Sequence, residues 1–186
     1  MTNHAMVAAP DRSWLKGYYA VRALFSVAWV ALAFTIGKSQ PAIGIGLLLI
    51  YPAWDCLANG YDAIRSGGLR ANPSQLINVV VSAIVTLAIA IAAPRDLHAA
   101  IGVIGLWAIL AGILQLATAV RRRRSAGAQW PMILSGAQSC LAGGHFLTMA
   151  TNAAAHPSVA DVAPYAAFGA LYFAISAGVL ARRGRG

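Results

Sequence analysis

The sequence predicts an all-α fold, an integral membrane bundle of six transmembrane helices arranged as three repeated helical hairpins. Of 186 residues, 59% are hydrophobic and only 10% are charged, and the mean hydropathy is +0.67. Soluble domains carry about 45–50% apolar and about 25% charged residues. Because a spanning helix needs about 20 mostly apolar residues, six such helices with short connections fill the chain. We therefore expect residues 1–186 to form a single membrane domain.

Six apolar runs supply the predicted helices, and several begin with residues typical of a helix start. Asn72 followed by Pro73, then Asp96, and then Pro131 are N-cap or first-turn signals. A cleaved signal peptide is the competing interpretation of the first run, but that run is long for a signal sequence. The runs cover approximately residues 14–36, 41–64, 75–93, 97–120, 130–150 and 159–180.

A weak threefold repeat groups these runs in pairs. Each connection within a pair contains one proline, at Pro41, Pro94 and Pro157. The second run of each pair also carries a similar apolar segment that ends in a small residue and is followed by arginine. Self-similarity in a constant order is typical of repeat architectures. We therefore predict hairpins over approximately residues 14–64, 75–120 and 130–180.

The cations are distributed unequally between the connections. Only Lys38 and Arg95 lie in the connections within the pairs. The positive-inside rule then predicts that both termini and the connections between the pairs are cytoplasmic. The net charge of +9 reflects this topology, and we do not expect a nucleic-acid partner. The cations expected on the cytoplasmic side are Arg12, Lys16, Arg65, Arg70, Arg121 to Arg124, Arg182, Arg183 and Arg185.

Four ionisable residues lie inside predicted helices, where charge is costly: Arg22, Asp55, Asp62 and His145. Asp55, Asn59 and Asp62 are spaced by four and three residues and therefore share one helix face. Helical rise places Arg22 and Asp55 at similar depth, so Arg22 is a candidate partner of Asp55, with Asp62 as the alternative. A structural ion-pair network is the favoured interpretation, and a proton or ion relay is the second.

Other polar residues suggest separate hypotheses. His145 titrates in a range that suits an acid sensor, although a hydrogen-bonded interior histidine is the commoner use. Arg121, Arg122, Arg123 and Arg124 are candidate contacts for anionic lipid headgroups, in addition to their role in topology. Small residues at four-residue spacing suit close packing of helices, either inside the bundle or in a homo-oligomer.

Sequence patterns for enzymatic chemistry are absent. There is no Gly-x-Ser-x-Gly elbow, no phosphate-binding loop followed by lysine and no zinc-protease helix. Cys56 and Cys140 fall inside apolar runs, so neither a disulfide framework nor a metal site is implied. The sequence therefore predicts a protein that is not an enzyme, with no catalytic residue, metal or cofactor.

Residues 102–124 read GVIGLWAILAGILQLATAVRRRR, and residues 21–25 in the first run read VRALF. In these stretches the chain resembles the HdeD-like acid-resistance membrane proteins, short-repeat integral membrane proteins of mostly unknown function. The resemblance covers nearly the whole chain, with a departure at residues 142–145 and in the loop around His156. It implies a bacterial inner-membrane protein associated with acid or envelope stress. The alternatives are a small transporter or channel for protons or a small solute, and an accessory subunit of a larger membrane complex.

Overall fold

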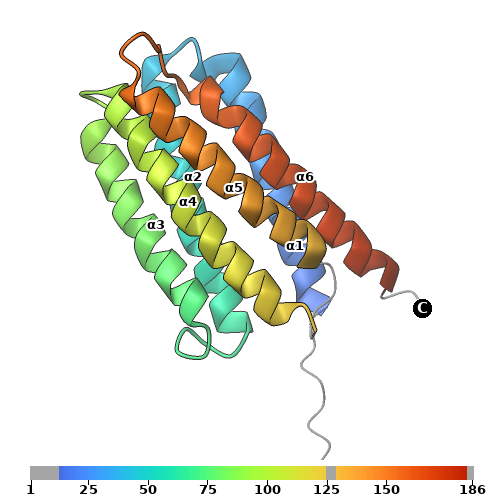
Figure 1. The fold of residues 1–186 in the computed structure, drawn as a ribbon. Coiled ribbons are helices and arrows are strands. Elements are labelled where there is room, and N and C mark those ends of the chain that lie inside the picture. Colours follow the sequence, from blue (N-terminus) through green and yellow to red (C-terminus); the bar gives the residue numbers. More distant parts are fainter. Residues whose placement is uncertain (1–12, 125–128, 184–186) are drawn as a thin grey trace, which may run out of the picture.

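The computed structural model describes residues 13–124 and 129–183, and this part of the chain contains helices and no strand (Figure 1). The predicted all-α class is therefore confirmed. Six long helices run side by side, and the first continues into a five-residue π-helical segment, η1. Their bounds are α1 Ser13–Leu32, η1 Ala33–Gly37, α2 Pro41–Arg65, α3 Pro73–Ala92, α4 Leu97–Arg122, α5 Gln129–Thr151 and α6 Val159–Arg183.

Two of the predicted helix starts behave differently from each other. Asp96 caps α4, because its carboxylate accepts a hydrogen bond from the backbone N–H of His98 at 2.8 Å. Asn72 precedes Pro73 as predicted, but its side chain does not cap α3. Its amide instead donates to the backbone carbonyl groups of Ser66 and Gly68, both at 2.9 Å. Asn72 therefore closes the α2–α3 connection, where unpaired carbonyl groups at the end of α2 compete for its amide.

Five helices are long and apolar enough to cross a membrane: α1 with η1, α2, α3, α4 and α6. This supports a multi-pass membrane protein. Helix α5 has 23 residues and is long enough, but it does not reach the same hydropathy. Its hydropathy is lowered by Gln129, Ser135, Gln138, Ser139 and His145. Five of the six predicted spans are thus recovered in the described part of the chain.

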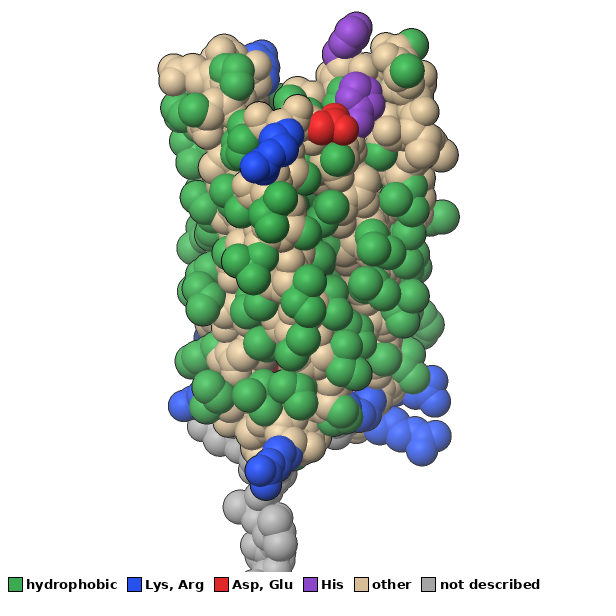
Figure 2. Space-filling view, turned by 90° about the vertical axis from the view of Figure 1, so that its left-hand side faces the viewer, with side chains coloured by type: hydrophobic (Ala, Val, Ile, Leu, Met, Phe, Trp, Pro, Cys, Tyr) green, Lys and Arg blue, Asp and Glu red, His purple; other side chains and the backbone are tan. Residues whose placement is uncertain are grey.

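The surface of the bundle is apolar over its middle and charged at its ends. Large apolar side chains such as Leu24, Leu57 and Leu141 are exposed, the last at 76%. Figure 2 shows hydrophobic side chains over the middle of one face of the bundle, with Lys and Arg side chains around its lower end and others near its upper end. We call the lower end the basic end; its described cations are Lys16, Arg65, Arg70, Arg121 to Arg124 and Arg182. Arg12 and Arg185 lie outside the described residues.

The closest helix pairs are α4 with α5, α1 with α6, and α2 with α3. By contrast, the backbones of α1 and α2, which were predicted to form the first hairpin, lie farther apart, and these helices meet through aromatic side chains such as Phe25 and Trp54. The α4–α5 contact is tight because glycines face each other: a Cβ atom at Gly143 would lie 2.5 Å from the carbonyl oxygen of Gly105. Small residues here serve close approach of helices within the bundle. The closest contacts therefore join helices from different predicted hairpins.

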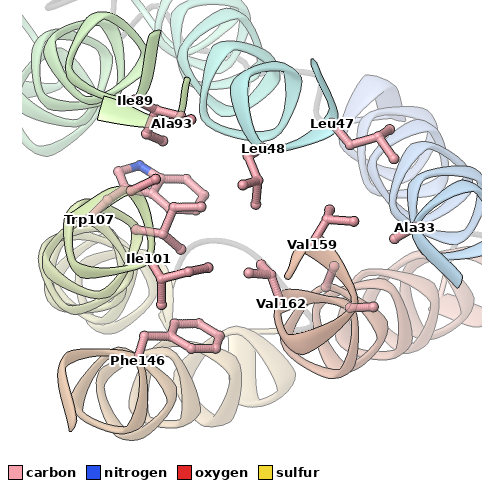
Figure 3. Packing of buried hydrophobic residues seen from close by; sticks show 14 of the residues in the cluster. Ala33, Leu47, Leu48, Ile89, Ala93, Ile101, Trp107, Phe146, Val159 and Val162 are labelled. Atoms are coloured by element: carbon pink, nitrogen blue, oxygen red, sulfur yellow. The ribbon is translucent and has the colours of Figure 1, made fainter. Parts of the chain in front are cut away.

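An apolar cluster fills the half of the bundle remote from the basic end. All six long helices contribute to it, and its interior members are almost fully buried. No water-accessible polar path is therefore expected through this half. Figure 3 shows its central side chains, among them Ala33, Leu47, Leu48, Ile89, Ile101, Trp107, Phe146, Val159 and Val162.

Candidate functional site

A polar cavity of about 80 Å³ lies between the apolar cluster and the basic end. Every long helix contributes to its wall, which combines ion pairs, amides, hydroxyl groups and aromatic rings. Polar groups at this depth in a membrane bundle are tolerated where they line a cavity or pair with one another. Lining residues include Tyr18, Arg22, Trp54, Asp55, Asn59, Asp62, Asn78, Trp107, Gln115, Arg122, Gln138, Ser139, Tyr165 and Tyr172.

Arg22 on α1 and Asp55 on α2 form the deeper ion pair, with 2.5 Å between Nη2 and Oδ1. Helical rise places each of them about 14–15 Å from the basic end of its helix. Nη1 of Arg22 donates to the Tyr18 hydroxyl at 3.0 Å, and the guanidinium group lies 4.3 Å from the ring centre of Phe173. Together with aromatic contacts between the two helices, this pair connects α1 with α2 in the cavity wall. Of the two partners considered for Arg22, the structure places Asp55 beside it.

The second carboxylate oxygen of Asp55 connects to two further helices. The Ser82 hydroxyl on α3 donates to Oδ2 of Asp55 at 3.1 Å, and Nε1 of Trp107 on α4 donates to the Ser82 oxygen at 3.0 Å. Ser82 is fully buried, and Trp107 also belongs to the apolar cluster. The chain of hydrogen bonds therefore runs from Arg22 to the boundary between the cavity and that cluster.

Sequence analysis did not single out Ser82 or Trp107. One signal was available, because Asn78 and Ser82 are four residues apart and form a polar stripe on α3 like that of Asp55 and Asn59 on α2. Trp107 carries no such signal, since a tryptophan in an apolar run is ordinarily a packing residue.

Asp62 lies about 10 Å nearer the basic end than Asp55 by helical rise and pairs with Arg122 on α4. Nη1 of Arg122 is 3.0 Å from both carboxylate oxygens, and the side chains are only 12% and 6% exposed. Ser66 and Gln75 also donate to Asp62, each at 3.2 Å. The second predicted carboxylate is therefore paired with a helix that sequence analysis had not connected to it.

The four consecutive arginines differ in their hydrogen-bond partners. Arg122 turns inward because the buried Asp62 carboxylate needs a counter-ion. Arg121 donates to the Ser74 hydroxyl at 3.2 Å and to the Gln75 side-chain oxygen at 2.9 Å. Arg121, Arg123 and Arg124 are exposed at the basic end, and the predicted contact of the four arginines with lipid headgroups stays a prediction.

The remaining predicted residues lie at different distances from this network. Asn59 lines the cavity, and its amide donates to the backbone carbonyl of Asp55 at 2.8 Å. His145 does not join it: the side chain is exposed on α5, while the next residue, Phe146, is buried in the apolar cluster. One residue along a helix is a turn of about 100°, so the inward position of Phe146 directs His145 outward.

The cavity wall presents both charged and uncharged hydrogen-bonding groups. The two arginines and two aspartates in its wall balance in charge, and amide and hydroxyl groups surround them. Within residues 13–124 and 129–183, no three His, Cys, Asp or Glu side chains are grouped as metal ligands would be.

Comparison with known proteins identifies one segment. Residues 77–148 match the family model described as a short repeat of unknown function, DUF308, to which HdeD-like proteins belong. The match covers less than half of the chain, from α3 to near the end of α5. No curated protein matches. No solved structure matches either.

Proposed function

We propose that this chain is a non-enzymatic bacterial inner-membrane protein that conducts a small polar solute or protons through its cavity. The observation that carries the proposal is the cavity itself, with two buried ion pairs in its wall. Ionisable residues at membrane depth typically mark solute, ion or proton pathways. A cavity near the basic end, with an apolar cluster beyond it, is the arrangement expected of a conducting protein closed on one side.

The alternative role for the ion pairs is structural, and their surroundings argue against that role alone. The closest helix pair, α4 with α5, packs through glycines. Arg22 and Asp55 instead contact each other in the wall of a cavity of about 80 Å³, which is large enough for several water molecules at about 10–15 Å³ for each. Charges used only to hold helices together are better placed away from such a cavity, because water and mobile solutes weaken the pair.

The proposed topology has six crossings, with both termini in the cytoplasm and α5 as the sixth span. Helix α5 lies along α4 and α6 in Figure 1, so it follows the same axis as two helices that are apolar enough to span. The cations of the basic end support a cytoplasmic position for it. There the exposed Arg121, Arg123 and Arg124 would contact anionic lipid headgroups. In this topology the helices still cross the membrane as three successive hairpins, as predicted.

The proposed physiological setting is acid or envelope stress. Its support is the similarity of residues 77–148 to a repeat family that includes HdeD-like proteins. This is an argument from family and not from the site. Survival of a deletion strain at low pH tests it: a loss that the wild-type gene restores is expected, and unchanged survival would contradict the setting while leaving conduction untouched.

Flux into liposomes tests conduction. Purified protein is reconstituted with a pH-sensitive dye inside the vesicles, and small solutes are followed by volume change. Wild-type protein is expected to carry flux, and Asp55→Asn is expected to abolish it, because the substitution removes the charge but keeps the shape of the side chain. Arg123→Gln, at an exposed arginine, is the matched control and should conduct normally. Flux no greater than in empty liposomes, at any pH tested, would exclude the proposal.

A further inference from the structure

Two nitrogen donors in the cavity wall lack an acceptor. Nε of Arg22 and Nε1 of Trp54 are buried, and neither has a hydrogen-bond partner among the described residues. Both side chains line the same cavity. Buried N–H groups are nearly always paired with protein, water or a ligand, so these two donors indicate where a bound molecule would present its acceptor.

The two donors are held in place by their surroundings. Trp54 directly precedes Asp55 on α2 and stacks on Phe25 of α1, with 4.4 Å between ring centres and 16° between ring planes. Phe25 lies about one turn from Arg22, whose other two nitrogens are occupied by Tyr18 and Asp55. Donors fixed by packing and by other hydrogen bonds are suited to selecting one acceptor geometry.

Size and charge narrow the class of ligand. A water molecule needs about 10–15 Å³ of such space, so a cavity of about 80 Å³ holds roughly five to eight groups of that size. Aromatic rings such as those of Tyr51 and Tyr172 provide apolar wall between the polar groups. The cations of the basic end raise the local concentration of anions. Together these features favour a short anion with an apolar part.

We propose that the cavity binds a small monocarboxylate of about five to eight non-hydrogen atoms, sized to that volume, whose carboxylate accepts hydrogen bonds from Nε of Arg22 and Nε1 of Trp54. Guanidinium groups bind carboxylates through strong charge-assisted hydrogen bonds. This inference deepens the proposed function, because it names the solute that the same cavity would conduct.

The charge of Asp55 has a consequence for binding. Asp55 already neutralises Arg22, so an added anion leaves a buried negative charge unless one proton enters with it. When a carboxylate and a proton bind together, the net charge of the site stays the same as with the two cations and two anions of the wall alone. The titratable groups near Asp55 are Arg22 and Tyr18 from α1, Tyr51 and Cys56 from α2 itself, and Tyr165 from α6. Helices α3 and α4 contribute the uncharged Ser82 and Trp107.

Equilibrium dialysis of the purified protein in detergent, with radiolabelled propionate as the probe, tests the site without requiring flux. Trp54→Phe removes the N–H donor but keeps a ring on Phe25, and we expect it to weaken binding about tenfold or more. Trp130→Phe is the matched control, since Trp130 is 75% exposed on α5, and should bind as wild type does. Arg22→Lys, which retains the positive charge but has no Nε donor, should also weaken binding.

Two further comparisons sharpen the test. Propionamide has the shape of propionate without its charge and should bind more weakly. Uptake of one proton with the anion should make binding of propionate about tenfold tighter at pH 6 than at pH 7. The carboxylate site would be overturned if propionate did not bind, or if propionamide bound equally well. It would also be overturned if a folded Trp54→Phe bound propionate with the affinity of wild type. An affinity for propionate that is independent of pH would overturn proton uptake. Flux that depends on Asp55 without propionate binding would leave the proposed function standing, whereas binding without any flux would overturn that function alone.

Discussion

Nη1 of Arg122 on α4 lies 3.0 Å from both carboxylate oxygens of Asp62 on α2. With the pair between Arg22 and Asp55, this gives α2 two buried carboxylates, each neutralised by a cation from a different helix. Helix α2 is thereby tied to α4 near the basic end and to α1 about 10 Å deeper, by helical rise. The cavity lies among these two ion pairs and the aromatic side chains of α6.

Removing one member of the Asp62–Arg122 pair should destabilise the bundle. Asp62→Asn leaves the buried Arg122 guanidinium without a counter-ion, and breaking a buried pair in this way costs up to about 3–5 kcal/mol. The double variant Asp62→Asn with Arg122→Gln should recover much of that loss, because no unpaired charge remains. Thermal unfolding in detergent measures both, with Arg123→Gln as an exposed control. A double variant no more stable than Asp62→Asn would show that the pair is not the source of the loss.

Replacing either of two adjacent glycines on α5 by alanine should change the stability of the protein in different ways. A Cβ atom at Gly143 would lie 2.5 Å from the Gly105 carbonyl oxygen and 2.6 Å from a side-chain carbon of Ile109, so Gly143→Ala should cost about 1–3 kcal/mol through overpacking. Gly144 has open space at that position, and Gly144→Ala should be neutral or stabilise by up to about 1 kcal/mol. Unfolding midpoints in one detergent provide the comparison. Equal midpoints would mean that α4 and α5 are not in close contact.

The hydrogen bonds of Ser82 predict an asymmetric double-mutant cycle. Ser82→Ala leaves the buried Trp107 N–H without its acceptor and should cost about 1–3 kcal/mol, whereas Trp107→Phe removes the donor and should cost less. The double variant should be more stable than the sum of the single losses predicts. Chemical unfolding followed by circular dichroism measures the cycle. Strict additivity would indicate that the two residues do not interact.

Labelling of single cysteines should establish the topology, including the crossing by α5. In a Cys56→Ala, Cys140→Ala background, an impermeant maleimide applied to intact cells should label Lys38→Cys and Asn152→Cys, which are exposed at the end opposite the basic end. Arg70→Cys and Arg124→Cys should be labelled only after the membrane is opened, because the basic end is cytoplasmic. Labelling of Arg124→Cys from outside, or protection of Asn152→Cys, would contradict a crossing by α5 in this direction.

Much of the helical framework was predictable, because it depends on properties that run along one segment of chain. Mean hydropathy identified the apolar runs, and Asp96 marked the start of α4 where the structure has it. The spacing of Asp55, Asn59 and Asp62 predicted a shared face, and all three line one cavity. Depth by helical rise was sufficient to name Asp55 as a candidate partner of Arg22, which the structure places beside it.

Which helices and which charged side chains meet was determined only by the tertiary structure. Which helices pack together depends on how their faces fit, as at Gly105 and Gly143, and close approach of this kind leaves no pattern in hydropathy. The inward turn of Arg122 depends on Asp62, which lies 60 positions earlier in the chain. The sequence by itself therefore determined that the chain is a helical membrane bundle with buried charge on α2. The tertiary structure decided which cations meet that charge and that a cavity lies between them, because both depend on packing between segments distant in sequence.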